Sequence, residues 1–520
     1  MRTLTSPRQH TLGDLLRRTR QRSPDKVAIR CGAVAWTYAQ FDDISNRLAA
    51  GLAAQGVLAG DRVAVLARNS HAFAALRFAL ARLGAVLVPV NFMLNTDDVR
   101  YILEHAGASI LCVDAGLLEL GKAAREGTDV RQMAWLPSEH ETVAPADMLT
   151  FDSLAATTTE VPTPALEAES LAQIVYTSGT ESRPKGAMLS HAAVIAEYVS
   201  CVADIAIATD DVMLHALPLF HCAQLDNFLG PCVYVGATNV ITAAPAPDKV
   251  LGLIESERIT SFFAPPTVWI SLLRSPLFEQ ANLDSLAKGY YGASIMPVEV
   301  LREMQQRLPG VRLWNLYGQT EIAPVALALQ PEDQLRKAGA AGRAVLNVET
   351  RVVDESMRDV APGEVGEIVH RSPQLLSGYY RDPERTAAAF EGGWFHSGDL
   401  GTVDEEGYIT VVDRMKDMIK SGGENVASRE VEEALYRMPG VAEAAVIGLP
   451  HPVWIEAVVA VVVAKSGHAL DEAELQAHCR RHLSPFKVPR QVMVVDALPK
   501  NASGKVLKRD LRQRYTTQQN

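Results

Sequence analysis

A loop rich in hydroxyl groups and glycine follows a short apolar segment at 174–176, and its composition suits polyphosphate binding. Positions 176–186 read Tyr-Thr-Ser-Gly-Thr-Glu-Ser-Arg-Pro-Lys-Gly. Glycine lets backbone N–H groups approach phosphate oxygens, hydroxyls donate further hydrogen bonds, and lysine adds a point charge. The alternative is a polar surface turn between a strand and a helix. The candidate binding residues are Thr177, Ser178, Gly179, Thr180 and Lys185.

This loop differs from a Walker A loop, in which a serine or threonine follows the lysine. Here Gly186 follows Lys185, so no hydroxyl stands where it would hold a metal. Ser190 is placed to cap a helix, which puts the loop just ahead of that helix.

Four further motifs follow along the chain: Tyr-Gly-Gln-Thr-Glu at 317–321, Ser-Gly-Asp at 397–399, Arg-Met-Lys-Asp at 414–417 and Gly-Lys at 504–505. In this order they resemble the adenylate-forming superfamily, which contains acyl-CoA synthetases, peptide-synthetase adenylation domains and firefly luciferase. The resemblance covers nearly the whole chain and is greatest to the fatty-acyl-CoA synthetases. It implies a ligase that activates a carboxylic acid with ATP and Mg²⁺, releases pyrophosphate, and passes the acyl group to coenzyme A.

Length and composition agree with a large soluble enzyme. A chain of 520 residues exceeds a single hydrophobic core, so we expect at least two domains. The net charge of −11 argues against a nucleic-acid-binding surface. The six cysteines form no Cys-x-x-Cys pair, which fits a reducing cytoplasm and argues against a disulfide framework. No apolar run could span a bilayer, so we do not expect an integral membrane protein. We expect a monomer or a homodimer.

Short apolar runs alternate with helix-length segments in the first part of the chain, which predicts an α/β fold with largely parallel sheets. Antiparallel strands are expected near 367–370 and 408–412. A helix at 428–436, strands at 444–447 and 457–464 and a last helix at 471–483 form a small α+β unit. The resemblance implies an N-terminal AMP-binding body, 1–414, of mostly parallel sheets sandwiched with helices plus a β-rich subdomain. It also implies a small mobile cap, 415–520. The Thr-, Ala-, Glu- and Pro-rich segment 138–163 is expected to be an exposed connection.

Adenylation requires the acid in line with the α-phosphorus, a neutralised triphosphate, and help for the leaving pyrophosphate. Thr320 and Glu321 supply a hydroxyl and a carboxylate, and a carboxylate beside phosphates is a magnesium ligand. The resemblance implies that Tyr317 stacks on adenine, that Asp399 accepts the ribose hydroxyls, and that Arg414 also reaches them. The remaining residues implied near the base are Gly292, Ala293, Ser294, Asn315 and Gly318.

The cap carries further residues that the resemblance implies. Lys505 bridges the acid and the α-phosphate, and Lys416 is the hinge about which the cap rotates for the thioester step. Rotation brings Gly422 and Gly423 into the site, where the lack of side chains leaves room for the pantetheine arm. In the body, His221 aligns with a residue that gates the acyl site and orients the carboxylate.

Two departures from the family pattern stand out. Glu181-Ser182 replaces Thr-Gly in the phosphate loop, and we expect Glu181 to face solvent or Arg183. Tyr291 replaces the first glycine of a common Gly-Gly-Ala element and is expected to narrow the acyl pocket.

The acid is inferred from what the acyl site lacks. Cys222 stands where amino-acid-activating domains place aspartate, and 220–229 and 290–296 contain no arginine, so amino acids and malonate-like acids are disfavoured. Gly318 is expected to leave the pocket open, and Tyr290 and Tyr291 to limit its length. A medium- or long-chain fatty acid is the first prediction. The alternatives are an aryl or cinnamate-like acid, and a carrier protein or another nucleophile as the acceptor. The apolar residues expected to line the pocket are Phe262, Phe263, Ala264, Pro265, Pro266, Leu225, Leu229 and Ile322.

Overall fold

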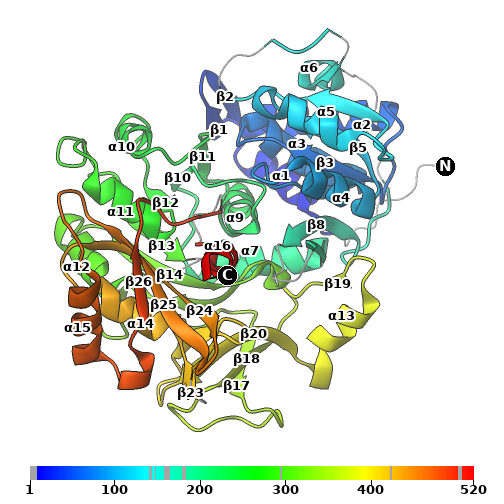
Figure 1. Ribbon diagram of the computed structural model, residues 1–520. Helices are drawn as coiled ribbons and strands as arrows, with labels where there is room; N and C mark the ends of the chain where they lie inside the picture. The colour runs from blue at the N-terminus through cyan, green and yellow to red at the C-terminus, as the bar shows by residue number, and fades with distance from the viewer. Residues whose placement is uncertain are drawn as a thin grey trace.

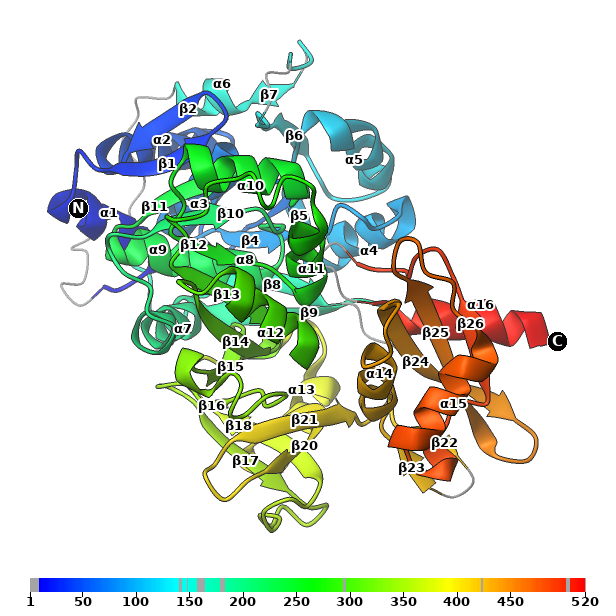
Figure 2. The ribbon, with the colours of Figure 1, turned by 90° about the vertical axis from the view of Figure 1, so that its left-hand side faces the viewer.

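The computed structural model describes residues 9–139, 143–146, 148–156, 164–177, 183–292, 296–421, 424–501 and 506–519. It contains four sheets (Figures 1 and 2). The first has nine strands, six of them consecutive parallel neighbours, in the order β16 (Arg343–Ala344), β15 (Val325–Leu329), β14 (Arg312–Gly318), β13 (Lys288–Gly292), β12 (Ser261–Phe263), β10 (Val212–His215), β11 (Thr238–Ile241), β1 (Val27–Cys31) and β2 (Val34–Thr37).

The second sheet has eight strands and is also mostly parallel. Its order is β19 (Gly378–Tyr379), β9 (Lys185–Ser190), β8 (Leu171–Thr177), β4 (Val86–Pro89), β3 (Arg62–Leu66), β5 (Ala108–Val113), β6 (Gln132–Trp135) and β7 (Leu149–Thr150). The central strands β3 and β4 are buried almost throughout, as expected for parallel strands covered on both faces.

Helices separate and cover these two sheets. Phe41 of α2 and Phe78 of α3 share one buried cluster with Ile29 of β1 and Val63 of β3, so the two helices are sandwiched between the sheets. Local signals fix their ends: Thr37 and Gln40 form a capping box at α2, and Gly84 ends α3 in the left-handed conformation. The helices and helical turns before residue 415 are α1 (Leu12–Arg22), α2 (Tyr38–Ala54), α3 (His71–Leu83), α4 (Thr96–Ala106), η1 (Ala115–Leu117), α5 (Leu118–Arg125), α6 (Phe151–Ala155), α7 (His191–Asp204), α8 (Cys222–Gln224), the π-helical turn η2 (Leu225–Leu229), α9 (Gly230–Val235), α10 (Pro247–Ser256), α11 (Pro266–Arg274), α12 (Val298–Arg307), η3 (Thr320–Ile322), η4 (Pro331–Asp333), α13 (Pro383–Ala389) and η5 (Glu391–Gly393).

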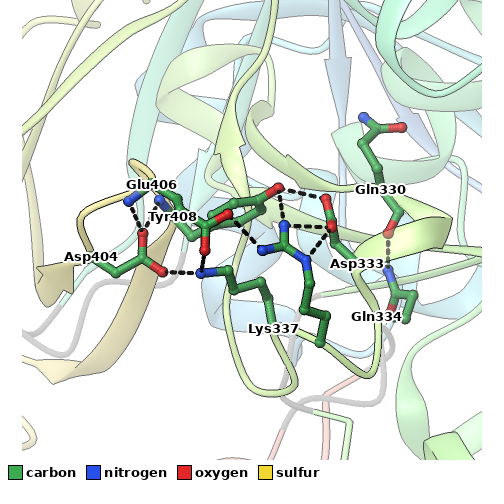
Figure 3. Close-up of polar contacts among 8 residues, drawn as sticks. Gln330, Asp333, Gln334, Lys337, Asp404, Glu406 and Tyr408 are labelled. Carbon is green, nitrogen blue, oxygen red and sulfur yellow. Dashed lines mark hydrogen bonds and ion pairs between the residues drawn. The ribbon is translucent and has the colours of Figure 1, made fainter.

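The third sheet is antiparallel, as the sequence predicts, with the order β17 (Glu349–Val353), β18 (Gly366–Arg371), β20 (Phe395–Val403) and β21 (Ile409–Arg414). A cluster of ion pairs fastens it to the first sheet (Figure 3). Arg336 binds Asp333 at 2.7 Å and Glu406 at 2.6 Å, while Lys337 binds Asp404 at 2.7 Å. Tyr408 donates to Asp333 Oδ2 at 2.5 Å. These contacts hold the segment after η4 against the β20–β21 hairpin.

The fourth sheet lies with its helices at one side of the other three (Figure 2). The buried clusters of this part draw their members from residue 419 onward, from Ile419 to Tyr515. The helix predicted at 471–483 is confirmed as α15, but it is not the last, because α16 follows it. The elements are β22 (Ile419–Ser421), β23 (Glu424–Val426), α14 (Ser428–Tyr436), β24 (Val441–His451), β25 (Ile455–Ala464), α15 (Glu472–His482), η6 (Pro485–Lys487), β26 (Gln491–Val494) and α16 (Lys508–Gln519).

Segment 138–163 is more ordered than expected where it is described. Phe151 and Leu154 of α6 are buried, and the Glu139 carboxylate accepts from the Ala243 N–H at 3.0 Å. All six cysteines are buried and free of disulfides. Within the described ranges, no helix has both the length and the apolar character needed to cross a membrane.

Candidate active site

A cleft of about 750 Å³ lies where β8, β14, η3 and the end of β21 meet. Its walls combine residues distant in sequence, including Thr177, Tyr317, Glu321 and Arg414. Lys416 and Asn501 also line it, so the C-terminal part of the chain reaches the same space. The cleft thus brings together most of the described residues singled out from sequence.

One end of the cleft is organised around the Asp399 carboxylate. The antiparallel register of β20 and β21 places Asp399 directly opposite Arg414, whose Nε lies 2.9 Å from Oδ1. Tyr317, on β14, donates its hydroxyl to Oδ2 at 2.7 Å. Burial is the largest effect on Arg414 and would lower its pKa, but the negative charges around it, Asp399 foremost with Glu321 and Asp417, together raise that pKa. The result is a buried carboxylate, paired with a guanidinium, that is suited to accepting two vicinal hydroxyls.

Tyr317 therefore uses its hydroxyl on Asp399 and leaves its ring to the cleft. Burial, followed by the Asp399 charge, raises the pKa of the Tyr317 phenol, so the hydroxyl remains a donor. The arrangement joins a flat aromatic face to a carboxylate that can accept a diol, and a nucleoside offers partners for both.

The floor beside Tyr317 is set by close backbone contacts. A Cβ on Gly292 would lie 2.4 Å from the Leu316 carbonyl oxygen, so this position admits no side chain without movement. Asn315 donates its amide to the Ala340 carbonyl at 3.0 Å, which ties β14 to the segment held by the Arg336 and Lys337 cluster. Ala293 and Ser294 lie outside the described residues.

The other end of the cleft gathers Lys185 and Glu321. Strands β8 and β9 pair antiparallel with Thr177 opposite Lys185, so the predicted phosphate loop connects two strands of a hairpin. The predicted helix, α7, follows after the short strand β9, which was not predicted from the sequence. Ser190 does cap α7 by accepting from the Ala193 N–H at 3.1 Å.

Lys185 and Glu321 hold each other in this structure. The Lys185 Nζ lies 3.0 Å from Glu321 Oε1, and the Tyr379 hydroxyl contacts the same two atoms, at 2.8 Å from Nζ and 3.0 Å from Oε1. Thr177 Oγ1 is buried and has no hydrogen-bond partner among the described residues. A lysine, one buried carboxylate and an unsatisfied hydroxyl at a cleft wall fit a site for phosphates and Mg²⁺. Ser178, Gly179, Thr180, Glu181 and Ser182 lie outside the described residues.

Thr320 and His221 lie between the two ends. The Thr320 hydroxyl contacts Cys222 Sγ at 3.3 Å, which joins η3 to the start of α8. His221 accepts from the Ala223 N–H through Nδ1 at 3.1 Å, so the neutral ring carries its proton on Nε2. Both residues line the cleft, where a hydroxyl and an imidazole N–H can orient a carboxylate.

Several predicted pocket residues lie elsewhere. Tyr290 donates to the Ile205 carbonyl at 2.9 Å within the core, and Tyr291 donates to Gln334 Oε1 at 2.5 Å in another buried cluster. The prediction that they limit the acyl pocket is therefore wrong. Gly318 lines the cleft, but the packing of the backbone, rather than the need for an open pocket, requires glycine there. A Cβ would lie 1.9 Å from the Pro324 carbonyl oxygen.

Of the apolar residues expected in the pocket, Phe263 lines the cleft. Phe262 packs on Trp269 with ring centroids 5.3 Å apart, and Leu225, Leu229 and Ile322 belong to buried cores. The sequence shows that these residues are apolar, but only the sheet topology decides which of them point into the cleft and which point into a buried core.

Sequence reasoning missed Tyr379 and Asn227. Tyr379 reaches the site from β19, and no spacing connects Gly378-Tyr379 to the distant Lys185. Asn227 lies in η2 and is 3% exposed, yet it lines the cleft beside Phe220 and Phe263. In the sequence, Asn227 is one of three polar residues that follow His221, with Gln224 and Asp226, and nothing there distinguishes it from the other two.

Models of two families match the chain: the AMP-binding enzymes at residues 16–380 and the AMP-binding enzyme C-terminal domain at 430–505. The chain belongs to the AMP-binding enzymes. It is an AMP-forming acid–CoA ligase that works through an acyl adenylate and uses ATP, Mg²⁺ and coenzyme A. The fold and the arrangement of the cleft agree with this family.

Relatives within the AMP-binding enzymes act on different acids. The chain is 38% identical to a feruloyl-CoA synthase from Amycolatopsis sp over 98% of its length and 100% of the relative. It is 35% identical to the long-chain-fatty-acid–CoA ligase FadD13 of Mycobacterium tuberculosis, over 93% and 94%. The crystal structure of an anthranilate CoA ligase with anthranoyl-AMP superposes with a TM-score of 0.91 at 26% identity, covering 99% of this chain and 98% of that one.

Proposed function

We propose that this ligase activates an aromatic acid of the cinnamate type. The observation that carries the proposal is the composition of the cleft wall, where Phe220 and Phe263 lie with the almost fully buried amide of Asn227. Two aromatic faces favour a planar ring, and ring pairs add about 0.5–1.5 kcal/mol beyond area burial. Burying the Asn227 amide against an alkyl chain would cost free energy, because the chain offers no hydrogen-bond partner, whereas a polar substituent on a ring could bond to it.

The position of Asn227 supports a substrate longer than benzoate. Asn227 follows His221 by six residues, along α8 and the π-helical turn η2, so the two side chains are separated along this helical segment. If His221 orients the carboxylate, Asn227 faces the distal end of the acid. A ring joined to its carboxylate by two carbons would reach that far, whereas a ring bonded directly to the carboxylate would fall short. The feruloyl-CoA synthase relative agrees with this reading.

We propose the following roles for the site residues. Asp399 and Arg414 bind the ribose, and Tyr317 stacks on the base, over the floor made by Gly292, Asn315 and Gly318. Thr177 and Lys185 bind the outer phosphates together with Ser178, Gly179 and Thr180, while Glu321 holds Mg²⁺. When bound, Mg²⁺ neutralises the phosphate charge. His221 and Thr320 orient the carboxylate that attacks the α-phosphorus, with pyrophosphate leaving.

We also propose that the chain divides into a body, 1–414, and a cap, 415–520, with Lys416 as the hinge. Lys416 and Asn501 line the cleft, and Asn501 lies four residues before Lys505. This supports an orientation of the cap for adenylation, in which Lys505 stabilises the charge at the α-phosphate. Lys505, Gly422 and Gly423 lie outside the described residues. A reducing compartment such as the cytoplasm suits six free thiols.

A fatty acid is the second candidate, supported by the FadD13 relative and by the size of the cleft. Pyrophosphate release with Mg-ATP, measured over a panel of acids, separates the two. We expect kcat/KM for 4-hydroxycinnamate and cinnamate to exceed that for octanoate and palmitate at least tenfold, with CoA then giving the thioester. A preference for the alkyl acids would reject the aromatic assignment and leave the ligase activity in place.

A further inference from the structure

Behind the Thr320–Glu321 turn lies a fully buried polar pair, Glu197 of α7 and Gln374, which precedes β19. Gln374 Nε2 donates to Glu197 Oε2 at 2.5 Å. The other carboxylate oxygen, Oε1, accepts from the Val325 N–H at 3.1 Å and from the Cys201 thiol at 3.3 Å. Ser200 donates to Gln374 Oε1 at 2.6 Å. Each carboxylate oxygen and the amide oxygen therefore has a donor.

The pair is hydrogen-bonded to the backbone at both ends of the short segment 322–325, which follows Glu321. Gln374 Nε2 also lies 2.9 Å from the Val325 carbonyl oxygen and 3.3 Å from that of Ile322. Two residues further along, the Leu376 N–H donates to the Glu321 carbonyl at 2.8 Å. The strand entering β19 and the carboxylate on α7 thus fix the backbone from Glu321 to Val325.

This segment has little internal support of its own. It is a single helical turn, η3, followed by Ala323 with φ of +70°. Such a backbone conformation persists only when its surroundings determine it. A buried polar pair is a costly way to add stability, because desolvation offsets most of the gain, but it can fix one geometry among several.

We propose that Gln374 and Glu197 are positioning residues that set the Thr320–Glu321 turn for metal and phosphate binding. This inference rests on the proposed role of Glu321. Neither residue lines the cleft, and both act through the backbone of η3. In the described part of the chain, Asp399 and Arg414 of the ribose end make no hydrogen bond to Glu197 or Gln374. Loss of the pair should therefore affect the two ends of the site unequally.

The test is Gln374→Met, which keeps the volume and removes the amide. We expect the rate of acid-dependent ATP–pyrophosphate exchange to fall about ten- to hundredfold, the effect of misplacing a reacting group by about 1 Å. The Mg²⁺ concentration for half-maximal exchange should rise at least fivefold. The dissociation constant for AMP, which engages the ribose end, should change less than twofold.

Gln334→Met is the matched control. Gln334, labelled in Figure 3, is also fully buried. It donates to a backbone carbonyl at the far end of β15, that of Leu329, at 2.9 Å. It should leave the Mg²⁺ requirement unchanged. The inference would be overturned if the Mg²⁺ concentration for half-maximal exchange rose equally in both variants, or if Gln374→Met weakened AMP binding in parallel. Either result would mean that Glu197 and Gln374 contribute only to the general packing of the protein.

A double-mutant cycle with Glu321→Gln gives a second readout. If Gln374 acts through Glu321, its effect on exchange should largely disappear once Glu321 is replaced, while additive effects would contradict the proposal. Should Gln374→Met fail to fold, Ser200→Ala replaces it, since it removes only the hydroxyl that orients the Gln374 amide. A smaller shift in the same direction is then expected, and no shift counts against the inference. Wild-type exchange with the acid tests the proposed function separately.

Discussion

The two ends of the nucleotide cleft are built by different means. At the ribose end, Asp399 and Arg414 face each other because adjacent antiparallel strands place them in register. At the phosphate end, Lys185 and Tyr379 come from the paired strands β9 and β19, but Glu321 lies on the separate helical turn η3 and meets them through side-chain contacts. Backbone register gives a site that exists before the nucleotide arrives. At the phosphate end, by contrast, Lys185 and Glu321 bind each other, and this ion pair must give way when the nucleotide binds.

Glu321→Gln tests the phosphate end and should have the largest effect. It removes the charge that we propose holds Mg²⁺ and leaves Lys185 without its ion pair. We expect acid-dependent pyrophosphate release to fall about 10²–10³-fold, the cost of losing one electrostatic contact in the transition state. Supplying preformed acyl adenylate with CoA provides the control, because the thioester step needs no triphosphate. An equal loss in that step would show that Glu321 serves more than adenylation.

Asp399→Asn tests the ribose end and should change binding more than chemistry. Hydrogen bonds to charged groups contribute about 1.5–3 kcal/mol each, so KM for ATP should rise roughly 10- to 100-fold. The turnover number should change little, because ribose contacts are the same in the ground and transition states. 2′-Deoxy-ATP is the matched substrate. Wild type should discriminate against it and the variant should not, whereas retained discrimination would place the ribose elsewhere.

The buried carboxyl group of Glu197, behind the phosphate end, should also make the stability of the protein depend on pH. Burial raises the pKa of Glu197 well above its usual value, against the lowering effect of hydrogen bonds from Val325 and Cys201, while the nearby Asp226 charge raises it further. Above about pH 4.5 the unfolded chain releases this proton and the native chain retains it, so the unfolding free energy falls as pH rises towards the native pKa.

Glu197→Gln removes that proton exchange. The unfolding free energy of the variant relative to wild type should therefore increase with pH, by at most about 1.4 kcal/mol per unit. Urea denaturation at several pH values between 5 and 8 measures it. A difference that is constant over this range would mean that Glu197 has the same pKa in both states.

Tyr379→Phe should have the smallest effect, because it removes one hydroxyl that touches both Lys185 and Glu321. A neutral hydrogen bond contributes about 0.5–1.5 kcal/mol, so pyrophosphate exchange should slow by up to about tenfold. KM for AMP in the reverse reaction should remain as in wild type. A larger loss would assign Tyr379 a direct contact with the phosphates.

The sequence predicted the α/β class, the antiparallel third sheet and the strand pair of the C-terminal part, because these depend on local periodicity. Asp399 and Arg414 were found through motifs and lie together as expected. Tyr379 and the Glu197–Gln374 pair were not found, since their partners are distant in the chain and only the sheet order unites them. Tyr290 and Tyr291 were misplaced because alternation along β13 does not reveal which face meets the cleft.

The burial of every cysteine bears on a hazard inherent in the reaction. An acyl adenylate reacts with any accessible thiolate, so the enzyme's own sulfur atoms could compete with CoA for the intermediate. Burial raises the pKa of Cys222, the cysteine beside Thr320, and brings that of Cys31 and Cys479 to about 11. These thiols remain protonated at neutral pH. The fold thereby protects the catalyst from self-acylation and leaves the acyl group to the thiol that arrives from solution.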